Sequence, residues 1–331
     1  MPNHWLQDNF HPFIIYALIG SFLAYILVLF VIKKLQIENP RTRSQLMLLP
    51  LVIPAFTSMA RVFEVAPRCF LLNINSGSQS LDSMLQGLCT ASNAMAILVT
   101  PLFFLAFAFA FIRVAMGFTT SHRLIRKFGF ATLATQSRII ESAQNLAYKG
   151  KIEIPQIVVT PYLFGQAFTF GYRKPVIVLS QGLIDNLDDE ELEAVLAHEL
   201  AHIIRKDAIL NWIAVFLRDL MFFAPVTYWV YNYFADENEK ASDDITLQLT
   251  DKPLAFAAAL IKVWKLSPKS LWSRLMWNNF SPNPGLVKKA GTLQIRVERV
   301  MNQVDHLRQP SVGWVAGGIV TSVTGVLFLV C

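Results

Sequence analysis

Four stretches of the sequence contain no charged residue over a length close to that of a transmembrane helix. They occupy residues 12–32, 44–60, 93–112 and 311–331. A helix needs about 20 mainly apolar residues to cross the hydrocarbon core, so each stretch is a candidate span. Residues 44–60 are the shortest and include Pro50 and Pro54, which also fits a re-entrant or interfacial segment; we favour a span. The pattern predicts about four transmembrane helices.

The residues between the third and fourth stretches follow the pattern of a domain outside the bilayer. Apolar residues at helical spacing predict packed helices near its start, and the Ile- and Val-rich residues 152–160 predict a strand. Residues 164–180 predict a hairpin with Gly171 and Pro175 near its turn. We therefore expect a mainly α membrane protein with an α+β domain that contains a small sheet.

The clearest helix signal in this domain follows Leu187. Asp188 fits the N-cap position, Glu191 fits the capping-box position, and acidic residues crowd the first turn, where the helix dipole favours them. Apolar residues then recur at helical spacing, at Leu192, Val195, Leu196, Leu200 and Ile203. The pattern predicts a helix from about residue 189 onward.

Residues 208–234 are again strongly apolar, but Arg218, Asp219 and Pro225 interrupt them. A charged pair at the centre of an isolated span would be costly. We expect helices that lie against the membrane or against its other helices, and a hairpin through the bilayer is the alternative.

Basic residues predict how the chain is oriented. Lys33, Lys34, Arg41 and Arg43 fill the short loop after the first span, and basic loops favour the cytoplasmic side. Both termini should then lie outside and residues 118–305 inside. We expect three parts: a membrane region at 1–117, a cytoplasmic domain at 118–305, and a C-terminal transmembrane helix within 306–331.

Composition supports this picture, with 54% hydrophobic and 16% charged residues. Lys and Arg facing anionic lipid explain the net charge of +6, so we expect the lipid bilayer as a partner and no direct nucleic-acid partner. Cys69 and Cys89 fall in the same predicted outer loop, where they could form a disulfide or stay free, and Cys331 ends the last span.

The candidate chemistry lies on the helix that begins near residue 189. His198 and His202 are four positions apart, so both imidazoles can face one metal ion. Glu199 lies beside them and could accept a proton from water. This H-E-x-x-H pattern is typical of zinc peptidases. The alternative is a helix with two histidines that are buried for structural reasons.

A catalytic zinc ion usually takes three protein ligands, so a third is required. The acidic run Asp236–Asp244 follows the first helix in the sequence. Glu239 and Asp243 are four positions apart and share a helix face, so one could bind the ion while the other orients a histidine. Spacing alone leaves Glu237 and Glu239 as alternatives for the ligand.

Several motifs together resemble the BlaR/MecR-type membrane metallopeptidases, which are gluzincins related to HtpX and Ste24. They are Pro175-Val-Ile-Val-Leu, the run from Glu191 to His202, Arg205-Lys-Asp207, and Glu237 to Asp243. The resemblance implies that Glu239 is the third ligand and Asp243 its matching aspartate. It also implies that Asp207 is not a ligand itself but supports the zinc ligands. Arg296 and Arg299 fall in a segment similar to the family's basic helix, and their role stays open.

The resemblance implies a zinc endopeptidase in the bacterial cytoplasmic membrane, with Zn²⁺ as its cofactor and the site on the cytoplasmic side. Its substrate would be a cytoplasmic or membrane-proximal protein, with a transcriptional repressor or the chain itself as candidates. Self-cleavage would fall within 267–291, a stretch rich in proline and asparagine. These features suggest a role in signalling or regulation, and the oligomeric state is left open.

Two departures from the family change the expectation. Ser242 stands where many relatives have Cys, which leaves zinc binding unaffected. The known antibiotic sensors continue past the last span into a β-lactam-binding domain, whereas this sequence ends at Cys331, so we expect a different input. The alternative function is a membrane signal transducer or scaffold with a structural zinc ion. Glu199 argues against it, because a structural site needs no such carboxylate.

Overall fold

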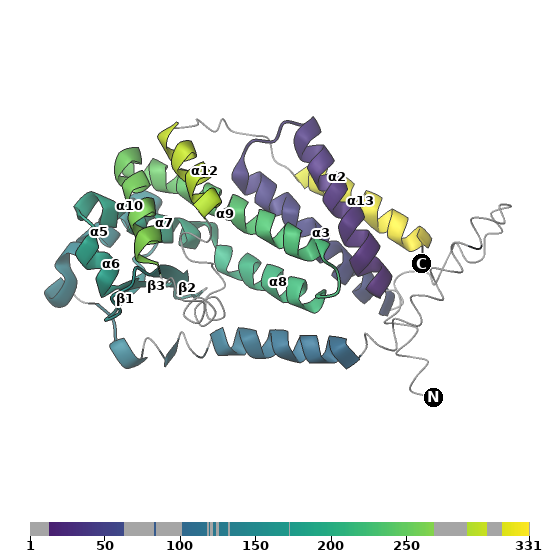
Figure 1. The fold of residues 1–331 in the computed structure, drawn as a ribbon, viewed down its shortest axis with the longest axis horizontal. Helices are drawn as coiled ribbons and strands as arrows, with labels where there is room; N and C mark the ends of the chain where they lie inside the picture. The colour runs from purple at the N-terminus through teal and green to yellow at the C-terminus, as the bar shows by residue number, and fades with distance from the viewer. Residues whose placement is uncertain are drawn as a thin grey trace. The chain divides into compact units, whose positions relative to one another are not determined.

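A computed structural model describes residues 13–62, 83, 101–117, 119, 122–123, 126–131, 133–171, 173–267, 290–302 and 313–330. Within them the protein is mainly helical and contains one three-stranded sheet (Figure 1), as the sequence predicts. The cysteines, residues 93–100 of the third predicted span, and most of the stretch 267–291 lie outside the described residues.

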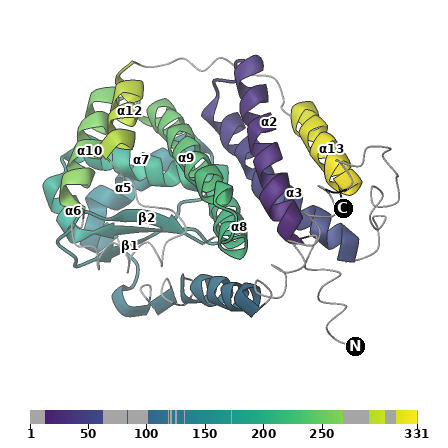
Figure 2. The same cartoon turned by 45° about the vertical axis from the view of Figure 1, so that its right-hand side comes forward.

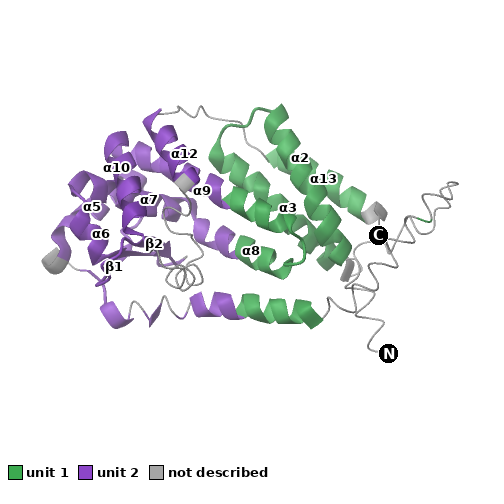
Figure 3. Cartoon of the chain, in the orientation of Figure 1, with its two compact units in different colours: residues 1–111, 214–234, 308–331 green, residues 112–213, 235–307 purple. Residues whose placement is uncertain are grey.

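The chain forms two compact units (Figure 3). Unit 1 comprises Met1–Phe111, Ala214–Phe234 and Arg308–Cys331, and unit 2 comprises Ile112–Ile213 and Ala235–Leu307. The predicted three-part division by membrane location stays a prediction.

Unit 1 contains the apolar helices. They are η1 (Tyr16–Gly20), α2 (Ser21–Lys34), α3 (Pro40–Val62), the start of the helix Pro101–Gly117, and α13 (Gly313–Val330). Among the described residues, one helix, Phe13–Lys34, is long and apolar enough to cross a membrane, and Pro101–Gly117 and Gly313–Leu327 are shorter apolar helices. The second predicted span lies within α3, which starts earlier than expected and therefore includes the basic residues Arg41 and Arg43.

Two local features show how unit 1 packs. A Cβ atom at Gly20 would lie 2.8 Å from Leu327 Cδ1, so glycine permits the close approach of η1 and α13. Residues 208–234, of which 214–234 belong to unit 1, fold into α8 (Asp207–Leu220), a turn, and the start of α9 (Val226–Thr250). The charged pair in this stretch is satisfied locally, because Arg218 donates to Asp219 Oδ1 and lies 4.4 Å from the Tyr231 ring centroid.

The sheet of unit 2 consists of β1 (Gln156–Thr160), β2 (Ala167–Phe170) and β3 (Val176–Ser180), in the order β1-β3-β2. β1 and β3 are parallel, while β2 and β3 form the predicted antiparallel hairpin. Gly171 turns the chain with a φ of +90°, and a Cβ there would lie 2.8 Å from the Lys174 carbonyl oxygen. β2 lies at one edge of the sheet.

Helices cover one side of this sheet (Figure 2). They include α5 (Leu133–Gly150), α6 (Gln181–Asn186), α7 (Asp189–Arg205), α10 (Pro253–Leu266) and α12 (Ala290–Met301). α7 packs against α5, α10 and β2, and α10 packs against α12. The core is built from apolar side chains of these elements, among them Leu146, Ile177, Leu196, Leu200 and Phe256. α7 is thus the central helix of unit 2.

Candidate metal centre

α7 begins where the sequence predicts. Asp188 accepts a hydrogen bond from the Glu191 backbone N–H at 2.9 Å, and Glu191 Oε2 accepts one from the Asp188 N–H at 2.9 Å. This capping box satisfies backbone donors that a helix end leaves unpaired. The helix ends at Arg205, where Lys206 adopts a left-handed conformation with φ 59°. A long, fixed helix therefore carries the two histidines.

His198 and His202 bring their ring nitrogens together on one face of α7. Their Nε2 atoms lie 3.2 Å apart. Both side chains are buried, with exposed fractions of 0% and 5%. Two imidazole nitrogens this close fit a shared cation better than two separate structural roles.

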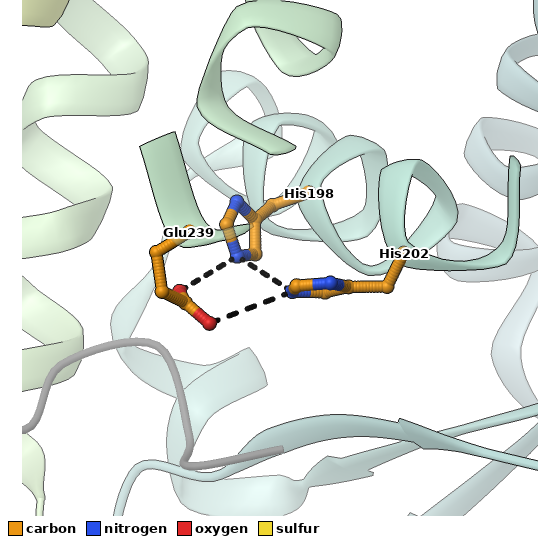
Figure 4. Close-up of side chains that lie close together, drawn as sticks. All are labelled: His198, His202 and Glu239. Carbon is orange, nitrogen blue, oxygen red and sulfur yellow. Dashed lines mark hydrogen bonds and ion pairs between the residues drawn. The ribbon is translucent and has the colours of Figure 1, made fainter. Parts of the chain in front are cut away.

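The third candidate ligand comes from α9. Glu239 Oε2 lies 3.4 Å from His198 Nε2, and Oε1 lies 3.8 Å from His202 Nε2 (Figure 4). Tetrahedral zinc with bonds of about 2.0–2.1 Å separates its ligand atoms by about 3.3–3.4 Å. The donor set therefore fits a zinc ion, and these three side chains could hold one. Glu237, the alternative that spacing left open, instead accepts a hydrogen bond from Lys240 at 2.8 Å.

Each histidine has a carboxylate behind it. His202 Nδ1 lies 3.0 Å from Asp207 Oδ2 and 3.2 Å from Ser242 Oγ. His198 Nδ1 lies 3.2 Å from Asp243 Oδ1. A carboxylate at Nδ1 holds the proton on that nitrogen and leaves the lone pair of Nε2 for a metal. Asp207 and Asp243 thus each contact one of the two histidines.

Two arginines that the sequence analysis gave no role complete the cluster. Arg205 Nε donates to Asp207 Oδ1 at 3.1 Å and its Nη1 to the Asn238 carbonyl oxygen at 3.1 Å. Arg296, on α12, donates to both Asp243 and Glu239. Arg205 lies inside a motif that the sequence analysis quoted, whereas Arg296 is 57 residues from Glu239 and no local signal links them.

The charges of the cluster favour a divalent cation. Its carboxylates belong to Glu199, Asp207, Glu239 and Asp243, and its guanidinium groups to Arg205 and Arg296. The carboxylates outnumber the guanidinium groups, and desolvation makes unpaired negative charge costly, so a bound cation would be favoured here.

The pKa values follow from this arrangement. Burial opposes a charge on His198, but the carboxylates of Asp243 and Glu239 outweigh it and raise the pKa of His198 to about 9. Burial alone would raise the pKa of Glu239, but the charges of Arg296 and the two histidines lower it to about 2. The ligand carboxylate is therefore ionised at neutral pH, and a metal ion would displace a proton from His198.

Glu199 lies next to the ligands and is held separately from them. Its Oε2 accepts a hydrogen bond from Thr169 Oγ1 of β2 at 2.8 Å. The carboxyl group is buried, and burial raises its pKa, although His202 and His198 oppose the shift. A raised pKa suits a carboxylate that takes up a proton near neutral pH. No pattern in the sequence points to Thr169, because the contact depends on how β2 packs against α7.

A pocket opens beside the cluster. It is lined by Thr169, Gly171, Pro175, His202, Ile203, Lys206 and Ala208, and so lies between the β2–β3 turn and the end of α7. His202 reaches both the pocket and the candidate metal position. The pocket's volume of about 20 Å³ is room for about one water molecule, which would lie beside His202.

Comparison with known proteins supports this chemistry. The family described as BlaR1 peptidase M56 matches residues 12–282. Similar curated proteins are named Protease HtpX homolog. The one from Trichormus variabilis is 29% identical over 133 residues, which cover 38% of this chain and 46% of the relative. The Pyrococcus furiosus protein is 33% identical and covers 38% and 44%, and the Gemmatimonas aurantiaca protein is 24% identical and covers 45% and 65%. The chain thus spans about half the length of these relatives.

Proposed function

Because the chain belongs to the BlaR1 peptidase M56 family, we propose that it is a membrane-bound zinc metalloendopeptidase. The observation that carries the proposal is the convergence of His198, His202 and Glu239, with the buried carboxylate of Glu199 beside them. A structural zinc site would explain the three ligands but not the buried carboxylate of Glu199, which accepts a hydrogen bond from Thr169. This arrangement favours a peptidase over a zinc-stabilised scaffold.

The residues would divide the reaction between them. A zinc ion at the site would polarise the carbonyl group of the peptide bond and lower the pKa of a water molecule. Glu199 would accept the proton of that water and pass it to the leaving amine. His198, His202 and Glu239 would bind the ion, and Asp243 and Asp207 would hold the two imidazoles in the orientation that exposes Nε2.

The edge strand β2 offers a place for the substrate. Its Thr169 holds Glu199, so a peptide that pairs with β2 would pass close to the proton acceptor. An extended segment can bind such an edge through backbone hydrogen bonds. We infer an unfolded or loop segment of a protein as the substrate.

Metal removal tests the proposed function directly. Purified protein that a chelator has stripped of metal should not cleave an unfolded protein such as casein, and zinc should restore cleavage. The reason is that the ion would polarise the carbonyl group and activate the water. Fragments would be followed by mass spectrometry. Cleavage that persists at the same rate in the stripped protein would contradict the proposal.

We further propose self-cleavage within 267–291 and a regulatory role. The support is that the described ends of this stretch, α10 and α12, belong to the same unit as the candidate metal centre, which raises its effective concentration there. In the incubation with zinc, the intact mass of the protein should fall by a fragment cut in this stretch. A mass that stays unchanged while casein is cleaved would exclude self-cleavage and leave the peptidase intact.

The exposed apolar side chains of unit 1 support a multi-pass membrane protein. They include Phe22, Ile26, Phe30, Phe56, Phe104, Leu105 and Phe109. Exposed apolar surface of this extent is unfavourable in water and would be covered by lipid. We propose four crossings of the bacterial cytoplasmic membrane, with the termini outside and the candidate metal centre on the cytoplasmic side.

Labelling of single cysteines tests this orientation. A maleimide that cannot cross the membrane should react in intact cells with Cys69 or Cys89 after reduction. In a background in which Cys69, Cys89 and Cys331 are replaced by serine, a Ser267→Cys variant should fail to react until the cells are opened. Equal labelling of the Ser267→Cys variant before and after opening would contradict the orientation.

A further inference from the structure

The guanidinium group of Arg296 contacts two carboxylates of the candidate metal centre at once. Its Nε donates to Asp243 Oδ2 at 2.7 Å and its Nη2 to Asp243 Oδ1 at 2.6 Å. Its Nη1 donates to Glu239 Oε2 at 3.0 Å. The side chain is 4% exposed, so these bonds form away from water, where charge-assisted hydrogen bonds are strong.

Through these contacts Arg296 can influence two of the three candidate ligands, Glu239 and His198. Glu239 is a candidate ligand itself. Asp243 Oδ1, which Arg296 holds, lies 3.2 Å from His198 Nδ1, so the position of Asp243 decides how the His198 ring is turned. We propose that Arg296 is the positioning residue of the metal centre, fixing Glu239 directly and His198 through Asp243. This inference rests on the proposed function, since it assumes that these residues bind a metal.

A positive charge without the shape of a guanidinium group could not make these three hydrogen bonds. Arginine is planar and presents its N–H groups in a fixed fork, so it can bind Asp243 through two bonds and Glu239 through a third. A lysine ammonium would supply the same charge as a compact point and could not hold both carboxylates in this way. The two roles predict different results for Arg296→Lys.

The same helix provides a matched control. Arg299 lies one turn further along α12, and its Nη2 donates to Asp244 at 2.9 and 3.0 Å. Asp244 follows Asp243 on α9, so both arginines join the same two helices. Of the two, Arg296 is buried against the candidate ligands, whereas Arg299 and Asp244 are 18% and 20% exposed. A general weakening of the contact between α9 and α12 would affect both variants.

The experiment measures metal binding by the full-length protein in detergent. Zinc affinity is determined by competition with a chelator, and Co²⁺ loaded in place of zinc reports the ligand geometry through its visible absorption. Arg296→Gln and Arg296→Lys should both weaken zinc binding about 10–100-fold, the usual effect of losing a residue that orients a metal ligand. Both should also change the Co²⁺ spectrum. Arg299→Gln should stay within about twofold of the wild type, because its ion pair with Asp244 is partly exposed to solvent and includes none of the three candidate ligands.

Other outcomes separate the possible failures. If Arg296→Lys matches the wild type in affinity and spectrum, Arg296 only supplies charge and the inference is wrong; it is also wrong if neither variant changes binding. If the wild type binds no zinc, the proposed function fails first. Should the Arg296 variants not fold, Asp243→Asn carries the test: it is expected to weaken zinc binding to a similar extent, and unchanged affinity would overturn the inference.

Discussion

Glu239→Ala is expected to lose its zinc, whereas Glu237→Ala is expected to keep it. The two residues lie two positions apart on α9 and carry the same carboxylate, but they have different partners. Glu239 lies within 3.4–3.8 Å of both histidine Nε2 atoms, while Glu237 accepts a hydrogen bond from Lys240. Removing a ligand should lower affinity by more than the roughly 10–100-fold that follows the loss of an outer partner.

The measurement is the zinc content of each purified variant after dialysis against a weak chelator. Glu237→Ala is the matched control, because it also removes a buried carboxylate from α9. Its zinc content should equal that of the wild type. Equal losses from the two variants would mean that α9 is disturbed as a whole and that Glu239 has no special place in the site.

The parts of the site that the sequence predicted are those that depend on neighbouring residues. The capping box at Asp188 needs only Glu191, three positions away, and the two histidines need only a helix between them. The β2–β3 hairpin likewise depends on the local turn at Gly171. Such features follow from helical and turn geometry, so a single sequence suffices to predict them.

The choice between Glu237 and Glu239 shows where local information ends. Two positions on a helix correspond to about 200° of rotation, so only one of the two can face α7. Packing of α9 against the rest of unit 2 decides which, and spacing could not. The resemblance to known metallopeptidases was needed to favour Glu239, and the structure places that residue beside both histidines.

Two contacts between distant segments could not be predicted. Thr169 and Glu199 are 30 residues apart, and Arg296 and Asp243 are 53 apart, with no pattern connecting either pair. Membrane spans were predicted from composition alone, which cannot show where a helix starts. α3 begins at Pro40 and so takes in Arg41 and Arg43, which the predicted span 44–60 had left outside.

Glu199→Gln is expected to abolish peptide cleavage while leaving zinc in place. Glutamine has nearly the shape of glutamate and can still meet the hydroxyl of Thr169, so the packing of β2 against α7 should survive. It cannot take up a proton from water, and general base catalysis contributes about 10²–10⁴-fold to rates. Glu199 is not one of the three candidate ligands, so the affinity for zinc should change little.

The most direct test of the account is to measure zinc content and the rate of casein cleavage on the same preparations of wild type and Glu199→Gln. The account predicts about one zinc ion per chain in both proteins and a rate that is about 10²–10⁴-fold lower in Glu199→Gln. If Glu199→Gln retains both its zinc and a rate equal to that of the wild type, Glu199 is not the proton acceptor, and the proposed mechanism is contradicted.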